Sequence, residues 1–372
     1  MKTAHRRPTL ANWIRWILLG AFVVLVLHPS CTPGFDPISR INSVRILAVT
    51  LDKPYALAGD TITMHMTVTD GLGDADGMPR QMQLVWLSGC FNPDGDQYFL
   101  CFEDLASQLA PLAEGGELPE DVVKVDLALP SSDGVPNAHE FSFTLPDDIV
   151  SSRDEPAAGP HYGIAYVFFA ACAGQLRPAA LESPGGGQVA DFPLECVDPE
   201  GNVLGSDSFI IGYTQVYAFA DERQNQNPPL EGLTLDGEVM SDDLEEVPVV
   251  RACPATYEER RTASCGDDPT ESCTVYQLAP TFTEGQLVAE RDPGAESIDG
   301  EPIDEVVWIS YFVTDGTVDP QLALVNDARE GRQNDIATEW TPPDRPGLYS
   351  IWAVVRDQRG GSALVRRFVR VE

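Results

Sequence analysis

The sequence predicts an all-β protein made of two similar domains. Three observations lead to this prediction. Apolar and polar residues alternate in many short segments, no segment after residue 30 keeps a 3.6-residue period over three turns, and the second half repeats the order of segments in the first. With 372 residues, of which 43% are hydrophobic, the chain is long enough to bury two ordinary cores.

Alternation with period two is clearest in the first half. In the segment TITMHMTV (61–68), the apolar residues share one face and the threonines and His65 share the other, which indicates a half-buried strand. The segments QMQLVWL (81–87) and EFSFTL (140–145) show the same pattern. Further strands rich in β-branched or aromatic residues are expected over residues 41–49, 161–172 and 208–220. One short helix is expected over residues 105–113.

The second half repeats this order, with strands expected over residues 230–237, 273–280, 305–313, 334–343, 347–357 and 362–371. In both halves a tryptophan, Trp86 or Trp308, lies within the third segment, and a strand beginning Pro-x-x-Tyr or Pro-Gly-x-Tyr follows later. This order resembles the immunoglobulin-like sandwich, which has a buried tryptophan on its third strand and a tyrosine corner before its sixth. The resemblance implies that Tyr349 and Tyr162 take the corner position.

The predicted fold class is therefore all-β, with two tandem immunoglobulin-like β-sandwiches that carry long, disulfide-clamped loop insertions and follow a signal peptide. A polar, proline-closed segment at 220–232 marks the boundary between the domains. The predicted organisation is a signal peptide at 1–30, a tether at 31–38, a first sandwich at 39–222, a linker at 223–229 and a second sandwich at 230–372. Insertions are expected at about residues 90–137, 174–206, 240–272 and 284–303, and any activity is expected there.

The amino end has the three parts of an export signal: basic residues, the apolar run WILLGAFVVLVL (16–27) and the small residue Ser30. The run is shorter than the roughly 20 residues that a membrane-spanning helix needs. The ending resembles that of bacterial lipoproteins, in which a small residue precedes an acylated cysteine. The resemblance implies that Cys31 carries lipid and, because Thr32 follows it, that the protein is sorted to the outer membrane of a Gram-negative cell. Ordinary cleavage with Cys31 in a disulfide, or a retained anchor helix, are the alternatives.

The chain is strongly acidic. Because residues 1–30 hold four basic residues and no acidic one, removing them leaves 20 Lys and Arg against 58 Asp and Glu. Such a surface repels phosphate backbones and anionic lipid head groups, which argues against a nucleic-acid partner and against electrostatic membrane binding. The membrane is then contacted through the N-terminal lipid.

The cysteines after Cys31 are expected to form disulfides, because an exported chain enters an oxidising compartment. The antiparallel third and sixth strands of the first sandwich would hold Cys90 and Cys172 about 25 Å apart, beyond the reach of a disulfide. We therefore expect Cys90 to pair with Cys101, and Cys172 with Cys196, each closing the base of one insertion.

The remaining cysteines leave one odd thiol if Cys31 is acylated. Cys253 with Cys273, or Cys265 with Cys273, are both possible pairs, and the sequence does not choose between them. The odd count is the best argument against acylation. Zinc is not expected at these cysteines, because there is no Cys-x-x-Cys motif.

No motif for catalysis or cofactor binding is present. Residues 31–372 contain His65, His139 and His161, but no HExxH, G-x-S-x-G or Walker motif. No catalytic residue, cofactor or metal ligand is therefore assigned, and the protein is expected not to be an enzyme. The calcium candidates are Asp70, Asp74, Asp76, Asp94 and Asp96. Neither acidic turn completes a twelve-residue loop with a closing glutamate, so solvated turns are expected.

The sequence thus predicts a non-enzymatic, lipid-anchored protein of the cell envelope. Its immunoglobulin-like domains are expected to be displayed for binding or structural interaction with an envelope protein or polysaccharide. A calcium-dependent adhesion module and a carboxylate-based hydrolase acting on envelope polysaccharide are the alternatives.

Overall fold

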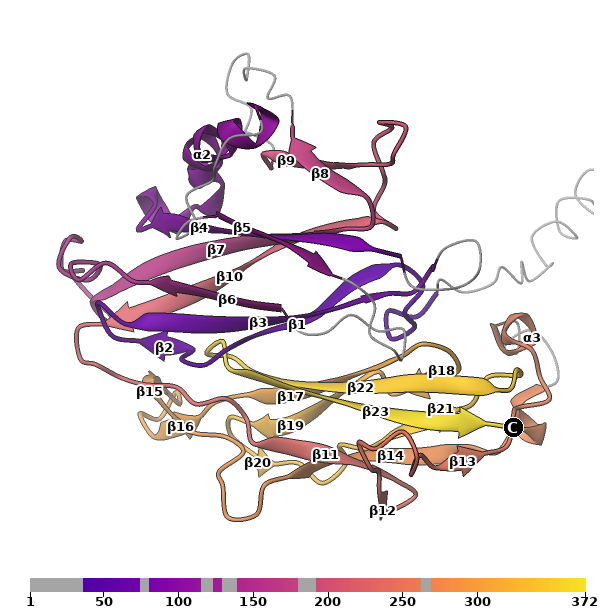
Figure 1. The fold of residues 1–372 in the computed structure, drawn as a ribbon. Helices are drawn as coiled ribbons and strands as arrows, with labels where there is room; N and C mark the ends of the chain where they lie inside the picture. Colours follow the sequence, from indigo (N-terminus) through magenta and orange to yellow (C-terminus); the bar gives the residue numbers. More distant parts are fainter. Residues whose placement is uncertain (1–35, 74–79, 115–122, 129–138, 180–191, 262–268) are drawn as a thin grey trace, which may run out of the picture.

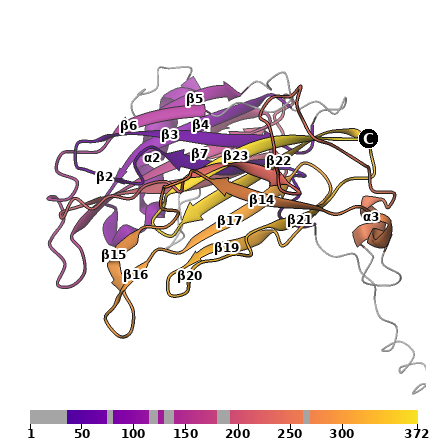
Figure 2. The same cartoon turned by 90° about the horizontal axis from the view of Figure 1, so that it is seen from below.

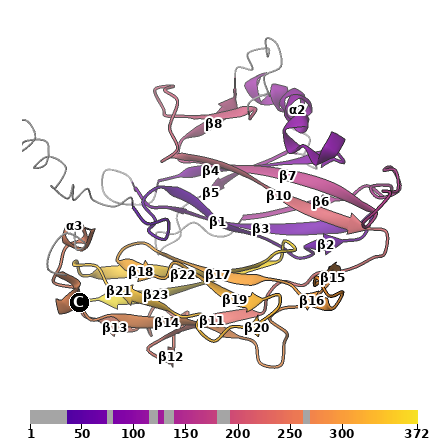
Figure 3. The ribbon, with the colours of Figure 1, turned by 180° about the vertical axis from the view of Figure 1, so that it is seen from behind.

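The computed structural model describes residues 36–73, 80–114, 123–128, 139–179, 192–261 and 269–372. These residues form two β-sandwiches that lie one above the other (Figure 1). The view from behind shows the same stacking, with β1 (Val44–Leu51) and β3 (Thr61–Asp70) of the first domain facing the second (Figure 3). The signal peptide expected at 1–30 and Cys31 lie outside the described residues.

In the described residues, the first domain has a three-stranded sheet in the order β1-β3-β6 and a five-stranded sheet in the order β2-β10-β7-β4-β5. Its remaining strands are β2 (Tyr55–Ala56), β4 (Met82–Phe91), β5 (Val123–Ala128), β6 (His139–Thr144), β7 (Tyr162–Cys172) and β10 (Phe209–Phe219). All neighbours are antiparallel except β2, which runs parallel to β10. Pairing of the first strand with the second, and of the third with the sixth, is the immunoglobulin-like order.

The second domain repeats this order in the sheets β12-β11-β14-β21-β18 and β13-β23-β22-β17-β19-β20. The strands of the first sheet are β11 (Leu230–Leu235), β12 (Glu238–Val239), β14 (Tyr276–Phe282), β18 (Thr317–Asp319) and β21 (Thr338–Thr341). Those of the second are β13 (Val249–Val250), β17 (Val307–Val313), β19 (Leu322–Asp327), β20 (Gly331–Arg332), β22 (Gly347–Asp357) and β23 (Ser362–Val371). Here β13 runs parallel to β23, as β2 does to β10. The predicted fold class of two tandem immunoglobulin-like sandwiches is confirmed.

The alternation in the first domain places the expected residues in its core. The apolar positions of β3 from Ile62 to Val68 are fully buried, whereas His65 is exposed. Trp86 is also fully buried, and its ring stacks on that of Phe141 with 5.6 Å between centroids. Burying large aromatic rings of this kind contributes strongly to the stability of a sandwich.

Trp308 does not fill the core of the second domain, contrary to its expected role. Val307 and Ile309 point inward, so the alternation of β17 turns the half-buried Trp308 to the outer face. Trp340, on β21, is fully buried in the core instead. The core tryptophan thus comes from the facing sheet.

Of the two expected tyrosine corners, the one in the second domain is confirmed. The Tyr349 hydroxyl donates to the Arg345 carbonyl oxygen at 2.9 Å, as that motif requires. The Tyr162 hydroxyl instead donates to the Asp96 carboxylate at 2.6 Å, so the corner expected at Tyr162 is wrong. The reason is that an insertion brings Asp96 to this end of β7, where it offers a stronger acceptor than a backbone carbonyl.

The insertions of the first domain form a cap on the outer face of its five-stranded sheet (Figure 1). The cap consists of η1 (Asp94–Asp96), η2 (Tyr98–Cys101), α2 (Phe102–Glu114), β8 (Gln175–Pro178) and β9 (Leu194–Val197). The helix expected over 105–113 is thus longer at both ends. Disulfides join Cys90 to Cys101 and Cys172 to Cys196, which are the expected pairings.

The insertions of the second domain extend from its two ends. They contain α3 (Tyr257–Arg261), η4 (Pro269–Ser272), β15 (Arg291–Glu296) and β16 (Pro302–Asp304). The β15–β16 hairpin and α3 lie at opposite ends of the domain, as the view from below shows (Figure 2). Cys253 is bonded to Cys273, one of the two expected alternatives, and Cys265 lies outside the described residues.

The domains are joined by a buried interface as well as by the linker. Trp352, on β22, is fully buried against Ile41 and Leu47 of the first domain. The Arg356 guanidinium donates to the Leu47 carbonyl oxygen at 2.5 Å, which ties β22 to β1. The two sandwiches therefore pack as one unit.

Candidate functional site

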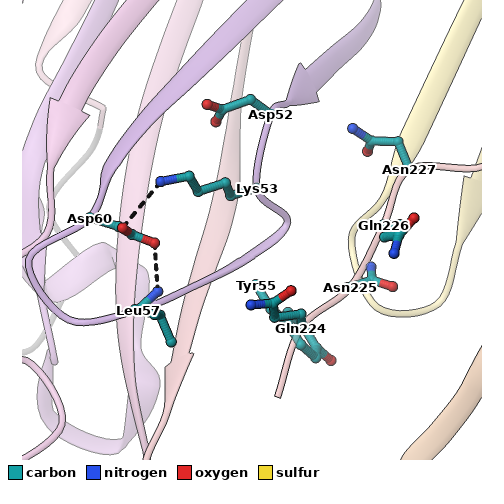
Figure 4. A pocket seen from close by; sticks show the side chains of 9 residues that line it. All are labelled: Asp52, Lys53, Tyr55, Leu57, Asp60, Gln224, Asn225, Gln226 and Asn227. Atoms are coloured by element: carbon teal, nitrogen blue, oxygen red, sulfur yellow. Dashed lines mark hydrogen bonds and ion pairs between the residues drawn. The ribbon is translucent and has the colours of Figure 1, made fainter. Parts of the chain in front are cut away.

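A cleft of about 610 Å³ lies where the linker passes the first domain (Figure 4). One wall is the loop that follows β1, and the other is the linker between β10 and β11. Its lining residues are Asp52, Lys53, Tyr55, Leu57, Asp60, Gln224, Asn225, Gln226 and Asn227. Ligand sites commonly have volumes of about 300–1,000 Å³ and lie at domain interfaces.

The wall from the first domain is fixed by hydrogen bonds to two carboxylates. Asp60 accepts from the Leu57 backbone N–H at 3.0 Å and pairs with the Lys53 ammonium at 3.1 Å. The backbone hydrogen bond, helped by Lys53, lowers the pKa of Asp60 below its ordinary value. Asp52 accepts from the Thr63 backbone N–H at 2.8 Å through one oxygen. Both carboxylates are therefore held in place as acceptors.

The linker wall is fixed to both domains by its asparagines. Asn227 donates to the Leu51 carbonyl oxygen at 2.6 Å and accepts from the Ser362 backbone N–H at 2.9 Å. Asn225 donates to both carboxylate oxygens of Asp357, at 3.2 and 3.3 Å. The composition of residues 223–229 is that of a linker, and it gives no sign of this double attachment.

A buried ionic cluster supports the linker from behind. The Arg359 guanidinium is 4% exposed and pairs with Glu305 at 2.6 Å and with Glu290 at 2.7 Å. It also donates to the Gln224 carbonyl oxygen at 3.2 Å, which fixes the start of the linker. Burial raises the pKa of Glu305 and of Asp357, because a carboxylate loses hydration in this interior.

Tyr55 lies between the two walls of the cleft, beside Gln224 in the view of Figure 4. Its ring packs on Phe219 with 4.8 Å between centroids, and the Arg359 guanidinium carbon lies 5.7 Å from its centroid. Burial raises the pKa of Tyr55 to about 12, so its hydroxyl stays protonated at neutral pH. The cleft thus presents a phenol, an ammonium, two carboxylates and side-chain amides.

This set of groups is suited to hydrogen bonding. The nine lining residues include no serine, cysteine or histidine that could act as a nucleophile or a base near neutral pH. Asp60 is ion-paired and its pKa is lowered, whereas a general acid requires a raised pKa. The lining thus offers hydrogen-bond donors and acceptors together with one ion pair.

A second hollow, of about 320 Å³, lies on the first domain between the cap and β10. It is lined by Tyr98, Phe102, Phe168, Phe192, Ile211, Gly212 and Tyr213. The rings of Tyr98 and Tyr213 stack on each other with 4.5 Å between centroids. Much of this aromatic surface is therefore covered by its own neighbours.

The aspartates considered as calcium ligands do not form one group, and two of them are paired with arginines. Asp70 accepts from the Arg80 guanidinium at 2.8 and 2.9 Å, and Asp96 pairs with Arg153 at 3.0 Å. The two aspartates flank opposite ends of β4, which is ten residues long. Asp94 is exposed, whereas Asp74 and Asp76 lie outside the described residues. Within the described residues, no group of three or more His, Cys, Asp or Glu side chains is placed to hold a metal ion.

Comparisons with known proteins identify no family. No family model matches the chain, and no curated protein matches it. Among solved structures, the D00–D0 domains of intimin cover 89% of this chain and 98% of their own length at 10% identity and a TM-score of 0.20. The C-terminal domain of the Streptococcus pyogenes antigen I/II-family protein AspA covers 89% of this chain and 100% of its own length at 8% identity and a TM-score of 0.20.

Fibronectin(III)-like modules of CbhA from Clostridium thermocellum cover 87% of this chain and 93% of their own length at 11% identity, with a TM-score of 0.19. At such scores we draw nothing from these similarities, and the fold assignment depends on strand order. In the part of the chain that the structure describes, no helix has the length and apolar character needed to cross a membrane.

Proposed function

We propose that the protein is a non-enzymatic binding protein of the bacterial envelope, anchored by a lipid on Cys31 and presenting its two domains as one body. One observation carries this proposal. The segment that follows the predicted acylation site is bound to the second domain, at the end of β1 opposite the cleft. An anchor at Cys31 would therefore hold the molecule with its cleft directed away from the membrane.

The contacts of this segment are numerous for its length. The Ile41 N–H donates to the Val313 carbonyl oxygen at 2.9 Å, and the Val313 N–H donates to the Ser39 carbonyl oxygen at 2.8 Å. Arg40 pairs with Asp315 at 3.3 Å, and its guanidinium carbon lies 3.6 Å from the centroid of the Tyr257 ring. A pull on the amino end is thus transmitted to the second domain as well as the first.

The geometry sets the orientation. The five residue-to-residue steps from Cys31 to Asp36 span at most about 18 Å, at about 3.6 Å per step. The Tyr257 hydroxyl of α3 donates to Asp36 at 2.7 Å, so α3 would lie close to the bilayer. The eight residues of β1 separate this contact from Asp52 of the cleft by about 26 Å. This attachment favours α3 of the second domain as the part of the protein nearest the bilayer.

The disulfides support an extracytoplasmic location. Three disulfides lie within the described residues, and such bonds persist in oxidising compartments. The acidic surface gives no electrostatic means of holding the protein on anionic lipids, so attachment would depend on the acyl chains.

The test is the mass of the N-terminal peptide of the protein extracted from membranes. We expect a peptide that begins at Cys31 and carries acyl mass, and we expect Cys31→Ser to release the protein from the membrane fraction. An unmodified Cys31 joined to another cysteine would overturn the anchor. As a control, Ser30→Ala keeps a small residue before the cysteine and should leave the protein anchored.

A further inference from the structure

We propose that the cleft between the linker and the first domain binds a neutral saccharide. This inference rests on the binding role proposed above and names the ligand class. It starts from the observation that the cleft residues carry more hydrogen-bond donors and acceptors than they use within the protein. A ligand must match both the hydrogen-bonding groups and the charges of the cleft.

Several polar groups of the cleft have unused hydrogen-bonding capacity. Among the described residues, the Gln224 and Gln226 side chains and the Tyr55 hydroxyl have no hydrogen-bond partner, and both glutamines are exposed. Asp52 uses only one of its two carboxylate oxygens. A hydroxyl group both donates and accepts, and amides and carboxylates are its ordinary partners.

Asn225 is the most telling of these residues because it is 5% exposed. Its Nδ2 lies within 3.3 Å of both oxygens of Asp357, which fixes the orientation of the amide. Its Oδ1 is buried and has no donor among the described residues. A buried acceptor without a donor is costly, and a ligand hydroxyl would remove that cost once the side chains that cover this atom move aside.

The charges of the cleft disfavour an anion. Asp52 and Asp60 line the cleft, and Glu290, Glu305 and Asp357 lie behind it, so an anion would meet repulsion. Lys53 pairs with Asp60, and Arg359 pairs with Glu290 and Glu305, so these cations offset part of that charge within the protein. A neutral ligand rich in hydroxyl groups avoids the repulsion and can still donate to the free oxygen of Asp52.

The apolar residues of the cleft complete the match. The Tyr55 ring and the Leu57 side chain offer an apolar surface beside the polar groups. A pyranose ring has the same two-sided character, with an apolar C–H face and hydroxyl groups around its edge. Aromatic rings with a polar tip suit ligands that are apolar on one side and wet on the other.

The test is titration of the purified full-length chain with short neutral oligosaccharides of glucose, mannose, galactose and N-acetylglucosamine, followed by calorimetry. Galacturonate oligomers and chitosan oligomers serve as anionic and cationic probes. We expect at least one neutral series to bind, the galacturonate series to bind at least tenfold more weakly, and the chitosan series to bind no more tightly than the neutral one.

Gln226→Ala tests the site, because the exposed side chain can be removed without opening the core. It should weaken binding about threefold to tenfold, the usual effect of losing one hydrogen bond. The matched control is Gln277→Ala, which removes another exposed glutamine from a strand that does not line the cleft and should leave binding unchanged. Tyr55→Leu should weaken binding further and is interpreted only if its thermal unfolding stays cooperative.

Three outcomes would overturn the saccharide inference. They are no binding of any neutral series at about 10 mM, tighter binding of a charged series, or equal affinities for the Gln226→Ala variant and the wild type. None of them bears on the acyl mass at Cys31, so the anchor and the ligand class fail separately. Cleavage of a bound oligosaccharide would support the ligand class and overturn the non-enzymatic assignment.

Discussion

Each domain has one sheet whose outer face is covered, the sheet that contains β7 in the first domain and the sheet that contains β22 in the second, but the covers differ. In the first, the outer face of the sheet that contains β7 is covered by the cap, a part of the same domain. In the second, the outer face of the equivalent sheet is covered by β1 of the first domain, through Trp352. One domain thus supplies its own cover, whereas the other uses its neighbour.

The two covers explain why apolar and polar residues do not alternate along β7 and β22. In β7, Val167 and Phe169 face the sandwich core while Tyr166 and Phe168 face the cap, so the strand is buried on both sides. In β22, Ile351 and its alternate neighbours face the core, and Trp352 faces the first domain. A strand buried on both faces is expected to be apolar throughout. An unbroken apolar run in a sandwich strand therefore indicates a second cover.

The largest loss of stability is expected when Trp352 is removed from the interface between the domains. Trp352→Ala should lower the free energy of unfolding by about 3–5 kcal/mol, because a fully buried indole is removed from contact with Ile41 and Leu47. Urea denaturation measures this loss. Amide hydrogen exchange should also become faster across β1, since its cover is gone.

Trp340→Ala is the matched contrast, because Trp340 is equally buried but lies inside the second sandwich. We expect a similar loss of stability, with faster exchange in β14 and β21 and no change in β1. If both variants accelerate exchange in β1 equally, the interface is not a separate unit of stability.

The cap can be broken through its disulfides. Replacing Cys172 and Cys196 together by alanine should cost about 3 kcal/mol, because the closed loop no longer restricts the unfolded chain. The variant should also bind a hydrophobic dye, since a loosened cap uncovers Phe168 and its neighbours. Thermal unfolding and dye fluorescence measure the two effects.

Removing the disulfide of the second domain is the control that separates loss of stability from loosening of the cap. Replacing Cys253 and Cys273 opens a loop of similar length, and a similar loss of stability is expected. It should leave dye binding unchanged, because that disulfide clamps no part of the cap. Equal dye binding by the two variants would show that the disulfides do not hold the cap closed.

The strands were predictable because a strand buried on one face has apolar residues at every second position, as in the segment from Ile62 to Val68. Trp308 was misplaced because a tryptophan within a strand does not reveal which face it occupies, and Val307 and Ile309 decide that. Strand direction excluded a bond between Cys90 and Cys172, and Cys101 was the expected partner of Cys90 because that bond closes the base of an insertion.

The interdomain contacts could not be predicted in the same way. Ile41 meets Trp352 because two complete sandwiches dock, and no local period encodes that event. The cleft has the same origin, since Gln226 and Tyr55 line one hollow only after docking. Sequence patterns specify elements and faces, whereas sites between domains depend on how finished surfaces fit.

Acid should act in opposite directions on the two regions. Burial alone would raise the pKa of Asp70, but hydrogen bonds from the Arg80 side chain and from the Arg80 and Leu72 N–H groups hold it below the ordinary value. Asp70 therefore stabilises the first domain above about pH 3.9, and this contribution is lost as the pH falls through its lowered pKa. Asp70→Asn should cost about 2 kcal/mol at neutral pH, and this cost should shrink as the pH falls through the lowered pKa of Asp70.

Asp357, behind the cleft, gives the contrast because burial raises its pKa. Its protonated form is favoured in the folded protein, so its contribution is greatest below the unfolded value of about 3.9 and is lost as the pH rises through the raised pKa. Asp357→Asn should therefore gain stability relative to the wild type as the pH rises from about 4 to 7. Urea titrations at several pH values measure both variants, and parallel pH profiles for the two would contradict the assignment.

The smallest expected effects distinguish the two tyrosines that occupy the corner position. Tyr349→Phe and Tyr162→Phe should each cost about 1 kcal/mol, the usual value of one hydrogen bond. Their acceptors differ, since Tyr349 donates to a backbone carbonyl and Tyr162 donates to the Asp96 side chain. In double-mutant cycles, Asp96→Ala should remove most of the effect of Tyr162→Phe and leave that of Tyr349→Phe intact. A cycle without coupling between Tyr162 and Asp96 would mean that packing alone holds Tyr162 in place, and that the Asp96 carboxylate does not replace the backbone acceptor of the corner.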